Sequence, residues 1–318
     1  MIAEVKSNNK VIFTHVAMPA SKSISNRVLI IKALCGSDFV IHNLSKATDT
    51  VQLGSILASK EDIIDAGDGG TTLRFLLAYY CLTGKNVEVT ASESLKKRPV
   101  VDLIDALRSL GAKIEYSDTE GRLPLKIVPS KLTGNSVTIS GEISSQFISA
   151  LMLIGPYING GLKIEMTGEM LSLPYILMTK SVMEYFGAEI SLDNNTILIK
   201  EGKYIGRDIT IEPDWSAASY WYEIAALSND AEILLEGLKP ESWQGDSVIS
   251  AMMNKLGVQT VFNEKGAFYL KFQAGRHVII LLMIFRMPRF STCSSKYLCS
   301  FECYSRFIGI EKLSFERI

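Results

Sequence analysis

The sequence predicts an α/β protein built from a repeated unit. Three segments share a helix, a glycine and a strand, and their glycines, Gly111, Gly187 and Gly257, lie 76 and 70 residues apart. Each glycine follows the last apolar residue of its helix, where a left-handed C-cap favours glycine. A second type of helix starts with small or hydroxylated residues at 70–75, 144–149 and 216–220, in register with the first. Self-similarity at a fixed period is typical of repeat architectures.

Strands are predicted between these helices. Short runs rich in β-branched residues occupy positions 86–90, 136–139 and 196–199, and such runs favour strands. The repeat stops after about Gln273. Residues 274–318 contain three of the five cysteines, an excess of basic residues and the aliphatic run 278–285. We therefore expect an aberrant tail that does not continue the repeat.

Composition limits the class of protein. A chain of 318 residues can hold two domains. The formal net charge of −1 argues against bulk nucleic-acid binding, which needs concentrated positive charge. The longest aliphatic run is too short to span a bilayer, and the N-terminus lacks an apolar signal core. The cysteines show neither CxxC nor zinc spacing, which indicates a reducing, cytoplasmic compartment, and the three scattered histidines indicate no metal site.

The most informative motif spans residues 19–27 and reads Pro-Ala-Ser-Lys-Ser-Ile-Ser-Asn-Arg. Ser21 or Ser23 is a plausible N-cap for the apolar helix that follows. The N–H groups at a helix start favour anions, Lys22 adds a charge, and Ser23 and Arg27 share one helix face because they lie four residues apart. The motif predicts a site for a phosphorylated small molecule. The alternative is an ordinary capped helix with solvated charges.

Four further segments could each bind an anion. Residues 67–74 form a Gly-rich turn that leads into a helix, and residues 95–99 place three cations before a proline that can open a helix. Residues 144–146 and 172–175 offer hydroxyl and amide groups at helix starts. Taken singly, each segment has an ordinary alternative. Residues 67–74 could be a common Gly-rich helix start, residues 95–99 more often a solvated basic loop, and residues 144–146 and 172–175 simple helix caps.

Together these motifs resemble the 5-enolpyruvylshikimate-3-phosphate synthase family, the enolpyruvyl transferases of the shikimate pathway. The matching segments follow the family order over about residues 1–272, namely 21–27, 70–74, 97–99, 144–147, 172–175, 212–220 and 244–246. The resemblance implies two domains of βαβαββ units with the active site between them. One domain would span residues 18–214, and the other would combine 1–17 with 215–273. Six such units need about 420 residues at this period, so the second domain would be incomplete.

The resemblance also implies a reaction, which moves the enolpyruvyl group of phosphoenolpyruvate to the 5-hydroxyl of shikimate 3-phosphate and releases phosphate. The pathway supplies chorismate and the aromatic amino acids. Lys22 would be the catalytic residue. The shikimate 3-phosphate ligands would be Ser23, Arg27, Ser144, Ser145, Gln146 and Ser172, with Arg27 facing the carboxylate. The phosphoenolpyruvate ligands would be Lys22, Gly70, Arg98 and Gln146. No metal, cofactor, nucleic acid or membrane is implied, and we expect a cytoplasmic monomer.

Two features depart from the family pattern. Asp68 stands where the family often has Asn or a small residue, and its charge beside an anion site is adverse unless it points away. The family's catalytic Asp, its Lys-Glu-Thr-Asp-Arg-like segment and its further Arg and Lys ligands are not found after residue 273. We therefore expect a truncated or frameshifted chain.

Two alternatives follow. One is an inactive fragment that retains shikimate 3-phosphate binding. The other is a sister enolpyruvyl transferase that acts on a UDP-aminosugar, whose signatures are an early Lys-Asn pair and a loop cysteine. Lys22 is followed here by Ser23, and neither Cys35 nor Cys81 lies in a Gly-rich loop. These residues argue against the aminosugar enzyme.

Overall fold

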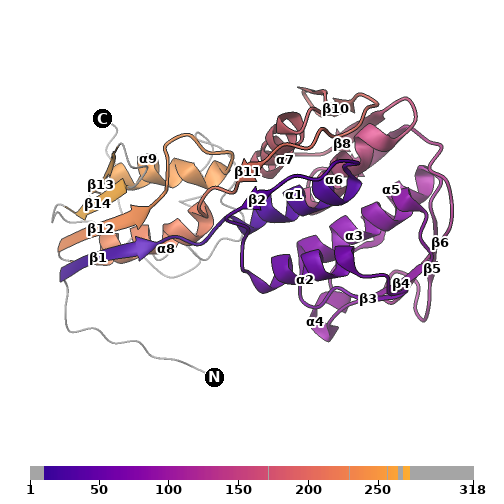
Figure 1. Cartoon of the computed structure of the whole chain (residues 1–318), viewed down its shortest axis with the longest axis horizontal. Helices are drawn as coiled ribbons and strands as arrows, with labels where there is room; N and C mark the ends of the chain where they lie inside the picture. Colours follow the sequence, from indigo (N-terminus) through magenta and orange to yellow (C-terminus); the bar gives the residue numbers. More distant parts are fainter. Residues whose placement is uncertain (1–10, 171, 229, 256, 264–267, 273–318) are drawn as a thin grey trace.

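The elements of the chain form two lobes that lie side by side in the computed structural model (Figure 1). The structure describes residues 11–170, 172–228, 230–255, 257–263 and 268–272. The large lobe contains the helices and strands from α1 to β11. The small lobe contains β1 and everything from α8 to β14. The expected aberrant tail lies outside the described residues.

Two complete repeat units make up most of the large lobe. The first contains β3 (Ile63–Asp65), α3 (Gly70–Thr83), β4 (Val87–Thr90), α4 (Glu93–Lys96), α5 (Val101–Ser109), β5 (Lys113–Tyr116) and β6 (Leu125–Val128). The second contains β7 (Ser136–Ser140), α6 (Ser145–Ile154), the 3-10 helix η1 (Gly155–Tyr157), β8 (Leu162–Thr167), α7 (Leu173–Tyr185), β9 (Ile190–Asp193) and β10 (Thr196–Ile199). Their sheets have the same topology, with orders β3-β4-β6-β5 and β7-β8-β10-β9. In each sheet the first two strands are parallel and the rest antiparallel.

The small lobe repeats this topology with a strand from the other end of the described chain. It contains β1 (Val11–Ala17), α8 (Trp215–Leu227), β12 (Asp230–Glu236), the 3-10 helix η2 (Gly245–Val248), α9 (Ile249–Asn254), β13 (Val258–Phe262) and β14 (Phe268–Phe272). The sheet order is β1-β12-β14-β13, with β1 and β12 parallel. The remaining elements belong to the large lobe. They are α1 (Lys22–Leu34), β2 (Ile41–His42), α2 (Thr48–Ala58) and β11 (Ile209–Thr210), and β2 and β11 form a short parallel sheet.

The predicted α/β class and the predicted repeat are confirmed. The strands expected at 86–90, 136–139 and 196–199 are β4, β7 and β10. Gly111, Gly187 and Gly257 all have left-handed backbones, with φ of 106°, 88° and 89°. A side chain is strained at such angles, so glycine is required where each helix turns back toward the next strand.

The buried apolar side chains of the described residues form two clusters, one in each lobe. The central helices of the large lobe are α3 and α6, and α6 is buried without interruption from Phe147 to Ile154. In the small lobe, Trp215 and Tyr222 of α8 pack with Ile233 and Leu235 of β12. The domain boundaries at 18–214 and at 1–17 with 215–273 stay predictions. Among the described residues, no helix has the length and apolar character that crossing a membrane requires.

Two chain segments connect the lobes and run next to each other. Ala20 and Pro213 form an isolated β-bridge. Beside it, Ser21 N donates to Glu212 O at 2.9 Å and Asp214 N donates to Pro19 O at 2.8 Å. Because α1 and α8 begin immediately after these contacts, one hydrogen-bonded crossing fixes the start of a helix in each lobe.

Candidate anion-binding site

The start of α1 carries the sequence motif that predicted a phosphate site. Ser21 is the N-cap and accepts from Ile24 N at 3.5 Å, so the alternative cap, Ser23, lies inside the helix. Lys22 Nζ is 3.1 Å from Asp49 Oδ2 of α2, and the Lys22 side chain is 45% exposed. The exposed ammonium is therefore accessible to a ligand, although it has an internal partner.

Arg27 lies deeper, between α1, α6 and α7. Its Nε donates to Thr179 Oγ1 at 2.7 Å, Nη1 donates to Ser23 O at 2.8 Å, and Nη2 donates to Ser149 Oγ at 3.1 Å and Tyr175 O at 3.5 Å. Burial lowers the pKa of Arg27 to about 10, so the group keeps its charge at neutral pH. The structure thus shows Arg27 joining three helices, and its expected contact with a substrate carboxylate stays a prediction.

The start of α3 is the point where several polar head groups meet. A Cβ added to Gly70 would lie 3.1 Å from Arg74 Nη1, 3.3 Å from Gln146 Oε1 and 3.4 Å from Arg98 Nη1. Gly69 occupies the N-cap position and has no side chain, which leaves the first N–H groups of α3 uncapped. Glycine at position 70 allows two guanidiniums and an amide to approach a helix N-terminus, an arrangement that suits an anion.

The two guanidiniums at this point differ in their surroundings. Arg74 is buried and donates from Nη1 to Gly70 O at 3.1 Å and from Nη2 to Pro99 O at 3.0 Å. Within the part of the chain that the structure describes, its Nε has no hydrogen-bond partner. Burial, and then the nearby charge of Arg98, lower the pKa of Arg74 to about 10. Arg98 is exposed. Two neighbouring cations repel each other, and a bound anion would relieve that repulsion.

The segment before α5 corrects one expectation. Proline was expected to open the helix after the basic residues, but α5 begins at Val101 with Val100 as its N-cap residue. Pro99 instead offers its carbonyl to Arg74. The preceding residues form the single turn of α4, capped by Ser92, and Arg98 N donates to Leu95 O at 3.0 Å. The basic stretch is therefore a short helix and turn rather than a loop.

The starts of α6 and α7 carry the remaining predicted ligands. Ser144 is the N-cap of α6 and accepts from Gln146 N at 3.2 Å. Ser145 is the first residue of that helix, and Gln146 places its amide beside Gly70. Ser172 is the N-cap residue of α7, with no side-chain capping bond. All three serines are partly exposed.

The structure thus brings some predicted residues together and leaves others paired elsewhere. Gly70, Arg98 and Gln146 converge. Lys22 reaches this group only indirectly, because its partner Asp49 accepts through its backbone O from Thr72 Oγ1 of α3 at 3.1 Å. Arg74 is the residue that sequence reasoning missed. Its i+4 spacing from Gly70 on one helix was the available signal.

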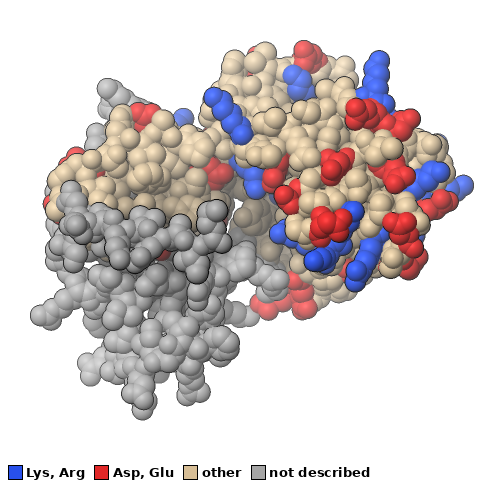
Figure 2. All heavy atoms as spheres, turned by 90° about the horizontal axis from the view of Figure 1, so that it is seen from below, with Lys and Arg blue, Asp and Glu red and all other residues tan. Residues whose placement is uncertain are grey.

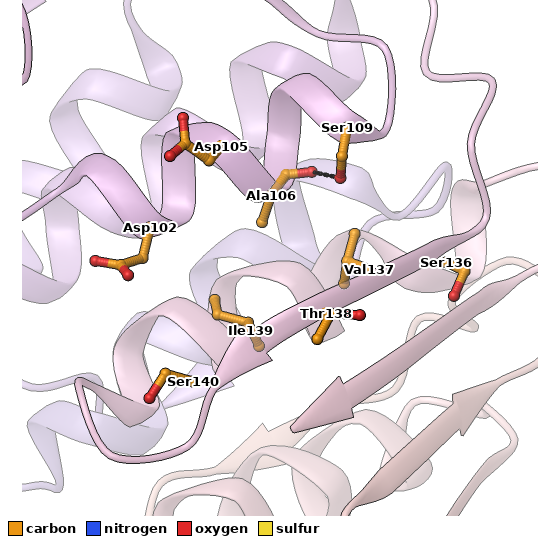
Figure 3. Close-up of a pocket in the computed structure, with 9 residues that line it drawn as sticks. All are labelled: Asp102, Asp105, Ala106, Ser109, Ser136, Val137, Thr138, Ile139 and Ser140. Atoms are coloured by element: carbon orange, nitrogen blue, oxygen red, sulfur yellow. Dashed lines mark hydrogen bonds between the residues drawn. The ribbon is translucent and has the colours of Figure 1, made fainter. Parts of the chain in front are cut away.

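A cavity of about 460 Å³ lies elsewhere on the large lobe, between α5 and β7 (Figure 3). It is lined by Asp102, Asp105, Ala106, Ser109 and residues 136–140. No predicted site residue lines it, and its carboxylates would repel an anion. The candidate anion site at Gly70 is therefore separate from this cavity. It combines the buried Arg74 guanidinium, the exposed Arg98 guanidinium and the Gln146 amide.

Charges of both signs are mixed on the face of the large lobe that Figure 2 shows. On this face, Lys and Arg side chains are interspersed with Asp and Glu side chains. Lys96 with Glu93 at 2.8 Å and Lys180 with Glu184 at 2.6 Å are two of the ion pairs. The described part of the chain contains no group of three or more His, Cys, Asp or Glu side chains placed to hold a metal.

Known proteins resemble this chain in sequence and in fold. The family model described as EPSP synthase (3-phosphoshikimate 1-carboxyvinyltransferase) matches residues 50–291. A 3-phosphoshikimate 1-carboxyvinyltransferase of Bacteroides fragilis is 46% identical over 252 residues, which cover 79% of this chain and 62% of the relative. The enzyme of that name in Pseudoalteromonas translucida is 33% identical, with 77% of this chain and 64% of the relative covered.

The fold comparison agrees. A solved EPSP synthase from Acinetobacter baumannii superposes with a TM-score of 0.66 at 21% identity, covering 83% of this chain and 64% of that chain. The chain therefore spans a little under two thirds of the length of these relatives.

Proposed function

The chain belongs to the EPSP synthase family, and from this premise we propose that it transfers the enolpyruvyl group of phosphoenolpyruvate to the 5-hydroxyl of shikimate 3-phosphate, with release of phosphate. The observation that carries the proposal is the convergence of Arg74, Arg98 and Gln146 on Gly70 at the start of α3. Both substrates are anionic, so the two guanidiniums at a helix N-terminus are the kind of donors that the reaction requires.

The site divides between the two substrates. We assign Lys22, Gly70, Arg98 and Gln146 to phosphoenolpyruvate. We assign Ser23, Arg27, Ser144, Ser145, Gln146 and Ser172 to shikimate 3-phosphate. The partly exposed hydroxyls at the starts of α6 and α7 support a role for those helices in holding a phosphate.

Arg27 needs a rearrangement to reach a substrate. Its longest hydrogen bond, from Nη2 to Tyr175 O at 3.5 Å, is the one that a substrate carboxylate would replace. An N–H to carboxylate bond is shorter and stronger than this contact. The other bonds of Arg27 hold the guanidinium in place during the exchange.

The chemistry needs a proton on the methylene carbon of phosphoenolpyruvate, attack by the hydroxyl, and loss of phosphate from a tetrahedral intermediate. Lys22 supports the proton transfer and the departure of phosphate as a positive charge with an exposed ammonium. Arg98 stabilises the negative charge that develops on the phosphate.

The place of action belongs to the same proposal. We place the enzyme in the cytoplasm as a monomer. Among the described residues, Cys35 and Cys81 are both free thiols, which suits a reducing compartment.

The decisive experiment has two steps. Shikimate 3-phosphate is titrated into the protein by calorimetry, and phosphate release is then assayed after phosphoenolpyruvate is added. We expect binding in the first step and release in the second. Binding without release would reject the transfer reaction and leave shikimate 3-phosphate binding. Absence of both would reject the whole proposal.

A further inference from the structure

Asp68, the residue whose charge looked adverse in the sequence, points toward the segment that carries Arg98. Its Oδ1 accepts from Ser94 Oγ at 2.8 Å and also from Ser92 Oγ. Alongside, Ser92 N donates to Gly67 O at 3.0 Å. The Gly-rich turn before α3 and the start of α4 are therefore joined through both side chains and backbone.

The hydrogen bonds from the two serine hydroxyls also stabilise the negatively charged form of Asp68. The hydrogen bond from Ser92, then that from Ser94, hold the pKa of the Asp68 carboxyl below its ordinary value, with a smaller effect from the charge of Arg98. The donors to this carboxylate are the hydroxyls of Ser92 and Ser94. Among the described residues, no hydrogen bond or ion pair joins it to the Arg98 guanidinium.

The other end of the segment is anchored as well. Arg98 follows α4 by two residues, and the carbonyl of the next residue, Pro99, accepts from Arg74 Nη2 at 3.0 Å. Asp68 thus binds this segment on the N-terminal side of Arg98, and Arg74 binds it on the C-terminal side. Both anchors come from α3 or from the turn that leads into it, so they fix Arg98 relative to Gly70, where its Nη1 approaches to within 3.4 Å of an added Cβ.

We propose that Asp68 is a positioning residue, which holds the segment 92–99 by its two serine hydroxyls so that Arg98 stays beside Gly70 and open to the phosphate of phosphoenolpyruvate. This inference rests on the proposed function, because it assigns Arg98 to that substrate. It explains how a carboxylate is tolerated beside an anion site, since its charge is satisfied by hydroxyl groups rather than by the guanidinium that binds the ligand.

The test compares Asp68→Ala with Asp68→Asn and with the control Asp62→Ala. Asp62 is an exposed carboxylate just before β3. Among the described residues, the hydrogen bonds and ion pairs of segment 92–99 are made with other groups than the Asp62 side chain. Affinities for phosphoenolpyruvate and for shikimate 3-phosphate are measured by calorimetry. Trypsin cleavage after Lys96 and Lys97 is timed by mass spectrometry, which reports the mobility of the segment without any ligand.

We expect Asp68→Ala to weaken phosphoenolpyruvate binding about tenfold, the size expected from losing a hydrogen bond to a charged group. The same variant should speed cleavage after Lys96 and Lys97 and leave shikimate 3-phosphate binding unchanged. Asp68→Asn keeps a side-chain oxygen that can accept from both serines, so it should restore affinity and protection. The Asp62→Ala control should match the wild type in all three measurements.

Several outcomes would overturn the inference. Wild-type cleavage rates in Asp68→Ala would show that Asp68 does not hold the segment. Faster cleavage with unchanged phosphoenolpyruvate affinity would show that the anchor does not serve Arg98, and equal loss of both ligands would indicate general unfolding. If the wild type binds neither substrate, the proposed function fails, and unchanged proteolysis would then overturn the anchor separately.

Discussion

At the scale of single residues, the charged groups of the candidate site differ in their burial and in their hydrogen bonds to the rest of the protein. Arg27 and Arg74 are both buried. Arg27 is bonded to hydroxyls of the neighbouring helices α6 and α7, and Arg74 is bonded to the carbonyls of Gly70 in its own helix and of Pro99. Lys22 and Arg98 are more exposed. Replacing a buried arginine would unpair its partners and destabilise the fold. The exposed cations are therefore the residues whose replacement should affect binding most selectively.

Lys22→Met should weaken phosphoenolpyruvate binding about 10- to 100-fold, because one charge-assisted contact is lost. The free energy of unfolding should fall by less than about 1 kcal/mol, since the pair with Asp49 is only partly buried and such pairs contribute little. Calorimetry and urea unfolding measure the two effects. Lys180→Met, which removes a comparable pair with Glu184 on α7, serves as the control and should keep full affinity.

At the scale of elements, the site consists mainly of helix starts. The starts of α1, α3, α6 and α7 supply Lys22, Gly70, Gln146 and Ser172. The packing of α3 against α6 brings Gly70 and Gln146 together. N-terminal N–H groups and their dipoles add to the side-chain charges. In the proposed site these elements would therefore act on an anion through their ends, while their apolar faces form the core.

Two neighbouring serines at the start of α6 allow helix capping and ligand binding to be tested separately. Ser144→Ala removes the bond from Gln146 N, and it should lower the free energy of unfolding by about 1 kcal/mol. Ser145→Ala removes a hydroxyl that does not cap the helix, so stability should change by less than about 0.5 kcal/mol while shikimate 3-phosphate affinity falls. Urea unfolding and calorimetry distinguish the two. Equal loss of stability in both variants would contradict the assignment of the cap.

At the scale of the whole molecule, one buried amide joins the lobes. Gln244 Oε1 accepts from Ser21 Oγ at 3.0 Å and Trp215 N at 3.1 Å. Its Nε2 donates to Glu212 Oε1 at 3.0 Å and Pro213 O at 2.7 Å. The N-cap residue of α1 and the first residue of α8 therefore donate hydrogen bonds to the same side chain. This couples the position of Lys22 to the small lobe.

Gln244→Leu should lower the free energy of unfolding by about 2–4 kcal/mol, because it leaves several buried polar groups without partners. Gln259→Leu, at an exposed position of β13, provides the matched control and should change stability little. Urea unfolding followed by tryptophan fluorescence measures both. A loss below 1 kcal/mol (about the size of one ordinary hydrogen bond) would show that water or nearby groups replace the amide.

The carboxyl group of Glu212, at the crossing between the lobes, makes the free energy of unfolding depend on pH. Burial raises the pKa of its carboxyl, against the opposing hydrogen bonds from Ser242 and Gln244. The folded state then binds this proton more tightly than the unfolded state, so the stabilisation is lost as pH rises from about 4.5 through the raised pKa. The wild type should therefore lose more stability between about pH 5 and about pH 7 than Glu212→Gln does. Urea unfolding at both pH values tests this, with the exposed Glu232→Gln as control.

The sequence by itself determined the repeat, the α/β class and the family. Glycines at a fixed spacing and hydroxylated helix starts are local signals, because backbone angles and capping depend on residues a few positions apart. The same locality explains why the capped start of α1 was predictable, and why the choice between Ser21 and Ser23 stayed open until the cap bond was seen.

Only the tertiary structure decided which of these groups meet. Gln146 reaches Gly70 because α3 packs on α6. Arg98 reaches it because Asp68 and Arg74 bind the two ends of segment 92–99. Lys22 pairs with Asp49, and Arg27 pairs with residues 122 and 152 positions away. Such contacts depend on the packing of distant elements, and local sequence patterns do not specify them.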